Sequence, residues 1–217
     1  MRKALKSRAE FIFVDAPHEA KGEEAEIRAA GGTGDHPRTW WHWEDLESTK
    51  RPSKAAHYTG WEASSSALLA ALNREQGVDG ILGMWPHPTG SHCFSQGSVA
   101  AALFLAELQR QSRQSSLKFA ILFSGFMPRD QTYAQQLGSG GHDKIAFPTL
   151  LVHGEADELV PLERGKQLAA SFLAGSLQVH GGAHCVPTCS GQIKTMIVNF
   201  LESVEHGEAQ LSQPPVA

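Results

Sequence analysis

The sequence predicts an α/β protein built on a doubly wound, mostly parallel sheet. Short apolar runs, of the kind that form strands covered on both faces, alternate along the chain with longer stretches of helical periodicity. Such alternation is typical of βαβ units joined by right-handed crossovers. The 217 residues, of which 41% are apolar, suffice for one domain with a full core. We expect this domain over residues 1–205 and a disordered tail over residues 206–217.

The expected strands are short runs that are rich in β-branched or aromatic side chains. Most of their positions are apolar, without the alternation of a half-exposed strand. Runs of this kind suit a parallel sheet, because helices cover both of its faces. They occupy residues 11–14, 80–82, 119–123, 149–153 and 177–179.

Helices are expected at the start of the chain and between the strands. Residues 1–8 are basic but lack the apolar stretch of a secretion signal, and they predict a short amphipathic helix. Residues 61–72 place Trp61, Ser65, Leu68, Leu69 and Leu72 on one helical face, and residues 193–204 repeat apolar side chains at i, i+3, i+4 and i+7, as an amphipathic helix does. Residues 98–108 are so rich in Ala, Leu and Phe that the helix they form must be buried.

Composition argues against several classes of function. Nineteen Lys and Arg against 23 Asp and Glu give a charge of −4, so nucleic acid is not expected as a partner. No run approaches the roughly 18 apolar residues that a membrane span needs. Three cysteines are too few, and odd in number, for a disulfide framework. This favours a reducing compartment, and we expect a protein of the cytoplasm, or of the cytoplasm and nucleus.

Three turns that follow expected strands carry candidate catalytic residues, and such turns are where open α/β sheets place their chemistry. Ser95 precedes the buried helix, at a sharp turn that resembles the nucleophile elbow of serine hydrolases. Asp157 lies in a carboxylate-rich loop that opens a helix near Pro161. His184 follows the last expected strand in a glycine-rich turn.

Ser95, Asp157 and His184 occur in the chain order that α/β-hydrolases use for their catalytic triad. In that chemistry His184 takes the proton of Ser95, while Asp157 orients the imidazole. Each residue alone has a commoner explanation as a turn residue, a helix N-cap or a solvated loop residue. Together, in this order and each after a strand, they favour the triad.

The chain resembles the small fungal and animal serine hydrolases of the FSH type, which are related to the ovarian tumour suppressor candidate hydrolase. The resemblance extends over most of the chain, through segments such as FIFVDAPH, YTGWEAS, FSQGSVAA, PTLLVHGEADELVP and HGGAHCVP. It implies a single α/β-hydrolase domain without a cofactor that cleaves small-molecule carboxylic esters or thioesters. Fungal members of the family release acyl chains from polyketide synthases. Carried onto this chain, it implies Ser95, Asp157 and His184 as the triad, with the N–H of Gln96 in the oxyanion hole.

The sequence departs from the family pattern in two places. Family members begin with a further strand and a His-Gly loop that supplies an oxyanion donor, so the first strand is expected to be missing here. Residues 84–93 stand between the expected strand and Ser95, where the family has none, and put Cys93 at a position that is usually glycine. These departures keep open an alternative, a catalytically impaired relative that acts as a binding or vestigial protein. The two departures themselves predict that the chain as given is poorly soluble and nearly inactive on short esters.

Two further groups of residues have alternative interpretations. Trp40 and Trp41 either line a substrate pocket or pack a long loop onto the sheet. A zinc-binding module is a minor alternative, because four metal-capable side chains lie within ten residues: His180, His184, Cys185 and Cys189. They are more crowded than the separated pairs of a usual zinc site, so no metal is expected.

A glycine cluster at residues 31–34 lacks the pattern of a nucleotide-binding loop. The oligomeric state does not follow from the sequence.

Overall fold

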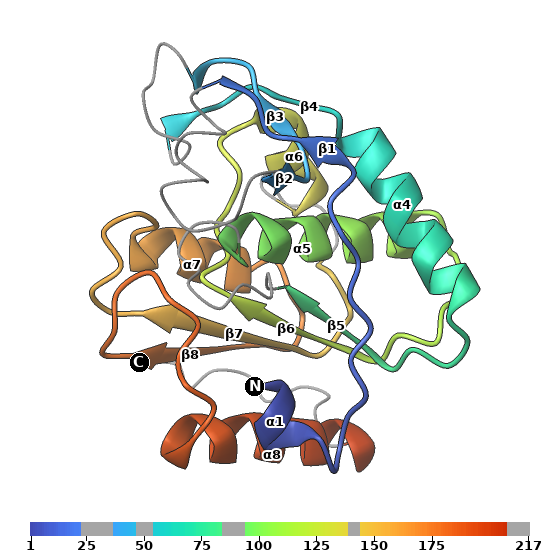
Figure 1. Cartoon of the computed structure of the whole chain (residues 1–217), viewed down its shortest axis with the longest axis vertical. Helices are drawn as coiled ribbons and strands as arrows, with labels where there is room; N and C mark the ends of the chain where they lie inside the picture. The colour runs from blue at the N-terminus through green and yellow to red at the C-terminus, as the bar shows by residue number, and fades with distance from the viewer. Residues whose placement is uncertain (23–36, 47–53, 84–93, 139–143, 208–217) are drawn as a thin grey trace.

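A four-stranded parallel sheet forms the centre of the protein in a computed structural model, which describes residues 1–22, 37–46, 54–83, 94–138 and 144–207 (Figure 1). Its strands stand in the order β5-β6-β7-β8. They comprise β5 (Gly80–Gly83), β6 (Phe119–Phe123), β7 (Thr149–Gly154) and β8 (Gly175–His180). The predicted strands at 80–82, 119–123, 149–153 and 177–179 are therefore confirmed.

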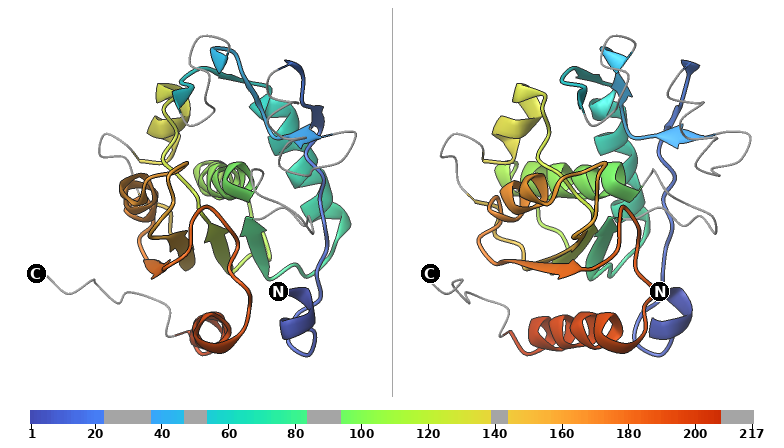
Figure 2. Two further views of the ribbon diagram at one scale, coloured as in Figure 1. Left: turned by 60° about the vertical axis from the view of Figure 1, so that its left-hand side comes forward. Right: turned by 90° about the vertical axis from the view of Figure 1, so that its left-hand side faces the viewer.

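Helices cover both faces of this sheet. On one face lie α5 (Phe94–Arg110) and α7 (Leu162–Ala169), and on the other lie α1 (Arg2–Leu5) and α8 (Gly191–Glu205) (Figures 1 and 2). Helix α4 (Trp61–Arg74) packs beside α5. Among the described residues, no helix is long and apolar enough to cross a membrane.

The two faces of the sheet carry separate apolar clusters. Because side chains alternate along a strand, Ala120 and Leu122 of β6 face the α5 side, while Ile121 and Phe123 face the α8 side. Ile197 is the fully buried residue of α8 on that second side. The two clusters hold α5 and α8 against opposite faces and so fix where the carboxyl ends of the strands emerge.

A smaller layer of short strands lies beyond α5 (Figure 1). It contains two antiparallel pairs and the short helix α6 (Gln131–Gln136). The first pair joins β1 (His18–Glu19) to β2 (Arg38–Thr39), and the second joins β3 (His42–Trp43) to β4 (Tyr58–Thr59). Aromatic rings hold this layer together, since Trp41 stacks on Tyr58 at 5.3 Å and Tyr58 stacks on Tyr133 at 5.8 Å.

The expected strand at residues 11–14 is wrong. This segment is irregular and runs along the β5 side of the molecule, and its Ile12 and Phe13 are both 49% exposed (Figure 1). Among the described strands, β5 pairs with β6 and with no other, so the sheet does not extend to residues 11–14. An apolar run without a neighbouring strand has no partner for its backbone groups and does not become a strand.

Two helix boundaries also differ from the expectations. The buried helix begins at Phe94 and not at residue 98, so Ser95 lies within its first turn. Helix α8 spans Gly191–Glu205, slightly longer at both ends than the expected helix over residues 193–204. The expected tail falls largely on residues 208–217, and the interruption before Ser95 falls on residues 84–93. Both lie outside the described residues.

Candidate active site

The three predicted catalytic residues follow three strands of the same sheet. Ser95 comes after β5, Asp157 after β7 and His184 after β8. Because these strands are parallel, their carboxyl ends meet at one edge of the sheet. The topology therefore brings all three residues to that edge.

Asp157 and His184 form a short, buried hydrogen bond. The Nδ1 atom of His184 lies 2.6 Å from Oδ2 of Asp157, and their side chains are 6% and 0% exposed. A carboxylate can only accept, so Nδ1 of His184 carries the proton of this hydrogen bond. This is the tautomer that a serine hydrolase requires.

The loop after β7 holds the carboxylate of Asp157 in a fixed orientation. Its Oδ1 accepts from the backbone N–H groups of Leu159, at 3.0 Å, and Val160, at 2.8 Å. Burial raises the pKa of Asp157, but the hydrogen bonds from His184 and Val160 outweigh it and hold the pKa below its ordinary value. Asp157 is thus kept charged beside the imidazole.

Ser95 lies in the first turn of α5 and is 7% exposed. Ser98, one turn later, anchors this end of the helix to two strands. Its hydroxyl accepts from the N–H of Phe123 at 2.9 Å and lies 2.6 Å from the carbonyl of Gly83 and 2.7 Å from that of Phe123, to either of which it can donate. Gly83 permits this contact, since a Cβ there would lie 2.5 Å from Cα of Ser98. Ser95 is therefore held close to the carboxyl ends of β5 and β6.

No hydrogen bond joins Ser95 to His184 among the residues that the structure describes. The structure pairs His184 with Asp157 and holds Ser95 separately, through α5. Ser95 lies in the first turn of α5 and not ahead of the helix, which corrects its expected position. The expected sharp turn itself falls on residues before Phe94, outside the described residues. Cys93 belongs to residues 84–93, which lead into α5 and lie outside the described residues.

The side chain of Gln96, the predicted oxyanion residue, binds the layer beyond α5. Its Oε1 accepts from the N–H of Trp40 at 3.1 Å and from the hydroxyl of Thr39 at 3.0 Å, and its Nε2 donates to the carbonyl of Trp41 at 3.2 Å. Gln96 is 1% exposed. Its backbone N–H lies at the N-terminal end of α5, where the helix dipole favours negative charge.

Trp40 and Trp41 lie in the core. Trp40 is 8% exposed, and Trp41 has no exposed surface and stacks on Tyr58. Trp41 also contacts Trp43 and Trp61 edge to face, with 6.4 Å between ring centres in both cases. In this structure the two residues pack the outer layer onto α5, and a role in binding substrate stays a prediction.

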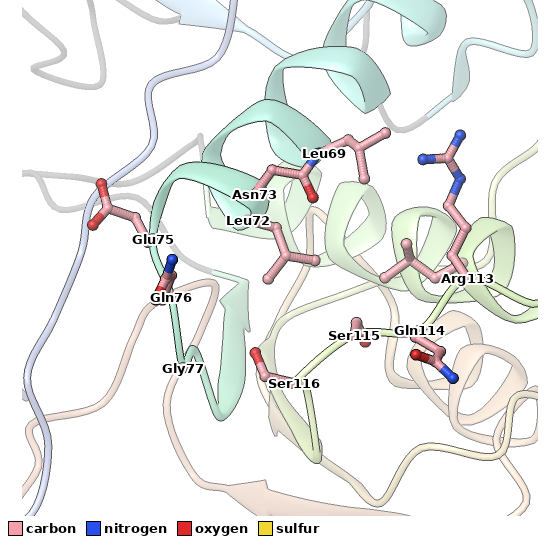
Figure 3. Close-up of a pocket in the computed structure, with 11 residues that line it drawn as sticks. Leu69, Leu72, Asn73, Glu75, Gln76, Gly77, Arg113, Gln114, Ser115 and Ser116 are labelled. Carbon is pink, nitrogen blue, oxygen red and sulfur yellow. The ribbon is translucent and has the colours of Figure 1, made fainter.

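A hollow of about 410 Å³ lies at the other end of the sheet. Figure 3 shows side chains from the end of α4, among them Leu69 and Leu72, opposite residues 113–116. These segments precede β5 and β6, so the hollow lies at the amino ends of the strands. It is therefore separate from the edge that carries Ser95, Asp157 and His184.

The cysteines and histidines of the minor zinc alternative do not gather around a common point. Cys189 packs in the apolar cluster under α8, and Nδ1 of His180 accepts from the N–H of Gly182 at 3.1 Å. Within the described ranges, no three His, Cys, Asp or Glu side chains form a group that could hold a metal ion. The described residues thus give the zinc alternative no support.

Sequence reasoning missed two residues that shape this edge, Ser98 and His153. Ser98 stands three positions after Ser95, and a polar residue in an otherwise apolar helix was a usable signal. His153 is the penultimate residue of β7 and stands four positions before Asp157. A polar side chain in an otherwise apolar strand was the corresponding signal.

Comparisons with known proteins identify relatives of this chain. The family described as serine hydrolase (FSH1) matches residues 1–196. An esterase of Drosophila melanogaster, Esterase CG5412, is 31% identical over 216 residues, covering 97% of this chain and 71% of the relative. Human esterase OVCA2 is 30% identical over 209 residues, covering 93% and 86% respectively. A solved structure of a variant of Arabidopsis thaliana SOBER1 is similar with a TM-score of 0.61 at 16% identity, over 94% of this chain and 90% of that one. That likeness concerns the α/β-hydrolase fold.

Proposed function

Because this chain belongs to the serine hydrolase (FSH1) family, we propose that it cleaves carboxylic esters or thioesters through an acyl-enzyme formed on Ser95. The proposal assigns Ser95 as the nucleophile, His184 as the general base and Asp157 as the residue that orients His184. The observation that carries it is the 2.6 Å hydrogen bond between Nδ1 of His184 and Asp157, which is the pairing that orients the imidazole in a catalytic triad.

The reaction divides into two steps of the same kind. The Oγ atom of Ser95 attacks the carbonyl carbon of the substrate as His184 removes its proton. The tetrahedral intermediate then collapses, and His184 returns that proton to the departing alcohol or thiol. A water molecule, deprotonated by His184, next attacks the acyl group on Ser95. The acid leaves as His184 returns this proton to the Oγ atom of Ser95. The imidazolium that forms in each step is stabilised by the charged Asp157.

The negative charge on the substrate oxygen needs donors that are already in place. We assign the backbone N–H of Gln96 as one donor, because it lies in the first turn of α5 beside Ser95. The side chain of Gln96 supports this role, since its contacts with Thr39, Trp40 and Trp41 keep the residue from rotating away. Removing one such donor in other hydrolases costs about 10²- to 10³-fold in kcat.

The substrate class follows from the family and not from a pocket. The chemistry suits an ester or a thioester equally, because both present a carbonyl carbon and a leaving group that accepts one proton. We extend the proposal to acyl release from a carrier-bound thioester in secondary metabolism, as in the fungal enzymes that the sequence resembles. Parallel assays with short p-nitrophenyl esters and with acyl thioesters of matched chain length distinguish the two substrate classes.

The nucleophile is tested with a fluorophosphonate probe, which reacts with an activated serine. We expect the probe to label Ser95, and Ser95→Ala to abolish both labelling and ester cleavage. Ser66→Ala is the matched control, because Ser66 is exposed on α4 and its hydroxyl donates to Glu62 of the same helix. Labelling that survives Ser95→Ala would overturn the assignment, and a folded wild-type chain that is neither labelled nor active would favour the impaired relative.

A further inference from the structure

A second histidine, His153, lies directly beside the Asp157–His184 pair. Its side chain is 2% exposed, and its Nε2 atom lies 3.7 Å from Oδ2 of Asp157 and 2.8 Å from the carbonyl oxygen of Val160. The family comparisons and the triad chemistry give this residue no task. A buried polar side chain next to the Asp157–His184 pair is expected to have a specific structural or functional role.

The hydrogen bond to Val160 places a proton on Nε2 of His153. A carbonyl oxygen only accepts, so Nε2 carries the proton and donates to Val160. The other side of the ring faces α7, where a Cβ on Gly165 would lie only 2.6 Å from Nδ1. The ring is thus wedged between the backbone of α7 and the loop that carries Asp157.

Val160 takes part in two hydrogen bonds of this arrangement, one as donor and one as acceptor. Its N–H donates to Oδ1 of Asp157 at 2.8 Å, and its carbonyl accepts from His153 at 2.8 Å. The carboxylate of Asp157 therefore closes the turn, and His153 fixes the closed turn to strand β7. Movement of Val160 would rotate the carboxylate whose other oxygen holds His184.

We propose that His153 is a positioning residue, which fixes the Asp157–Val160 turn so that Asp157 presents Oδ2 to His184. The inference rests on the proposed function, because it concerns the orientation of the assigned catalytic base. A histidine that only packs the core would affect the stability of the fold. A positioning residue also affects kcat and the geometry of the His184–Asp157 hydrogen bond.

The test compares His153→Phe, which fills the space without a donor, with His153→Gln, which keeps an N–H near the position of Nε2. With a p-nitrophenyl ester we expect His153→Phe to lower kcat by about 10- to 100-fold, since displacements of about 1 Å carry such costs. We expect KM to stay unchanged and His153→Gln to recover most of the lost rate. His18→Phe is the matched control, because Nε2 of His18 binds the carbonyl of Gly60 at 2.7 Å in the outer layer, and it should leave kcat unchanged.

Proton NMR supplies a measurement that does not depend on turnover. The proton that His184 donates to Asp157 should give a low-field resonance, which we expect to move or broaden in His153→Phe and to return in His153→Gln. If His153→Phe does not fold, Gly165→Ala takes its place, because it keeps the histidine and presses a methyl group against the ring.

A double-variant cycle shows whether the effect passes through Asp157. We expect His153→Phe to slow fluorophosphonate labelling of Ser95 in the wild-type background and to add little in Asp157→Asn. Equal effects in both backgrounds, an unchanged kcat in His153→Phe, or no recovery in His153→Gln would each overturn the inference. Failure of the proposed function is seen separately, as activity or labelling that survives Ser95→Ala.

Discussion

At the scale of single residues, the candidate site depends on one carboxylate among several. Glu155 and Glu158 flank Asp157 in the same loop, but both are exposed, whereas Asp157 is buried against His184. We expect Asp157→Asn to lower kcat by about 10⁴-fold, because an amide favours the wrong imidazole tautomer. Glu155→Gln and Glu158→Gln should leave kcat unchanged in the same assay. If either of them is the damaging change, the orienting carboxylate is not Asp157.

The lowered pKa of Asp157 also makes a prediction about stability. The folded chain binds this proton less readily than the unfolded chain, whose carboxyl titrates near 3.8. Charged Asp157 therefore stabilises the fold fully above pH 3.8, and this contribution disappears as the pH falls through the lower pKa of the folded state. The unfolding free energies of the wild type and of Asp157→Asn, measured in urea between pH 6 and pH 2, should differ by a constant amount down to about pH 4 and converge below it. Curves that stay parallel would contradict the pKa assignment.

At the scale of elements, the contact between β5 and α5 determines where Ser95 lies. A Cβ at Gly83 would meet backbone atoms of Ser98, at 2.5 Å from Cα and 3.0 Å from N, so no rotamer change relieves it. We expect Gly83→Ala to shift α5, to destabilise the fold by about 1–3 kcal/mol and to lower kcat by about 10²-fold.

Gly181→Ala is the control for Gly83→Ala, because no atom lies within 4 Å of a Cβ at Gly181. Urea denaturation and the ester assay on both variants give the two measurements. If Gly83→Ala keeps the stability and the rate of the wild type, the close packing of α5 on β5 does not position Ser95.

The sequence predicts elements well where the pattern is local. Residues 119–123 are apolar at every position and form β6 with the predicted bounds. Residues 11–14 have the same character and form no strand, because the outcome depends on a neighbouring strand that a local pattern does not contain. The start of α5 was placed late, since Ser95, Gln96 and Gly97 add no apolar signal ahead of Ser98.

The pairing of His184 with Asp157 could be predicted because chain order and strand ends determine it. The role suggested for His153 could not, since a histidine in an apolar strand looks like a satisfied core residue. Its contacts with Val160 and Gly165 depend on how the loop and α7 fold back over β7. The same holds for Gln96, whose side chain contacts a segment more than fifty positions earlier in the chain.

At the scale of the whole molecule, an exposed apolar segment lies along the β5 side of the sheet. Ile12 and Phe13 are both 49% exposed, whereas Phe11 next to them packs against the cluster on the α8 side. Ile12→Thr with Phe13→Thr should reduce aggregation, measured by light scattering, and change the stability by no more than about 0.5 kcal/mol. Phe11→Thr should destabilise the fold. Equal aggregation of the double variant and the wild type would show that the molecules do not aggregate through this segment.

The aromatic packing beyond α5 has a consequence for spectroscopy. Trp40, Trp41, Trp43 and Trp61 all belong to the outer layer and to the start of α4, which packs against it. In a Trp85→Phe variant, which leaves these four as the tryptophans of the chain, the intrinsic fluorescence therefore reports on that layer, while far-ultraviolet circular dichroism reports on the sheet and the long helices. Gln96 links the layer to the turn that carries Ser95. A red shift in emission that precedes the loss of ellipticity on heating would thus mark the temperature at which the enzyme stops working while most of its backbone is still folded.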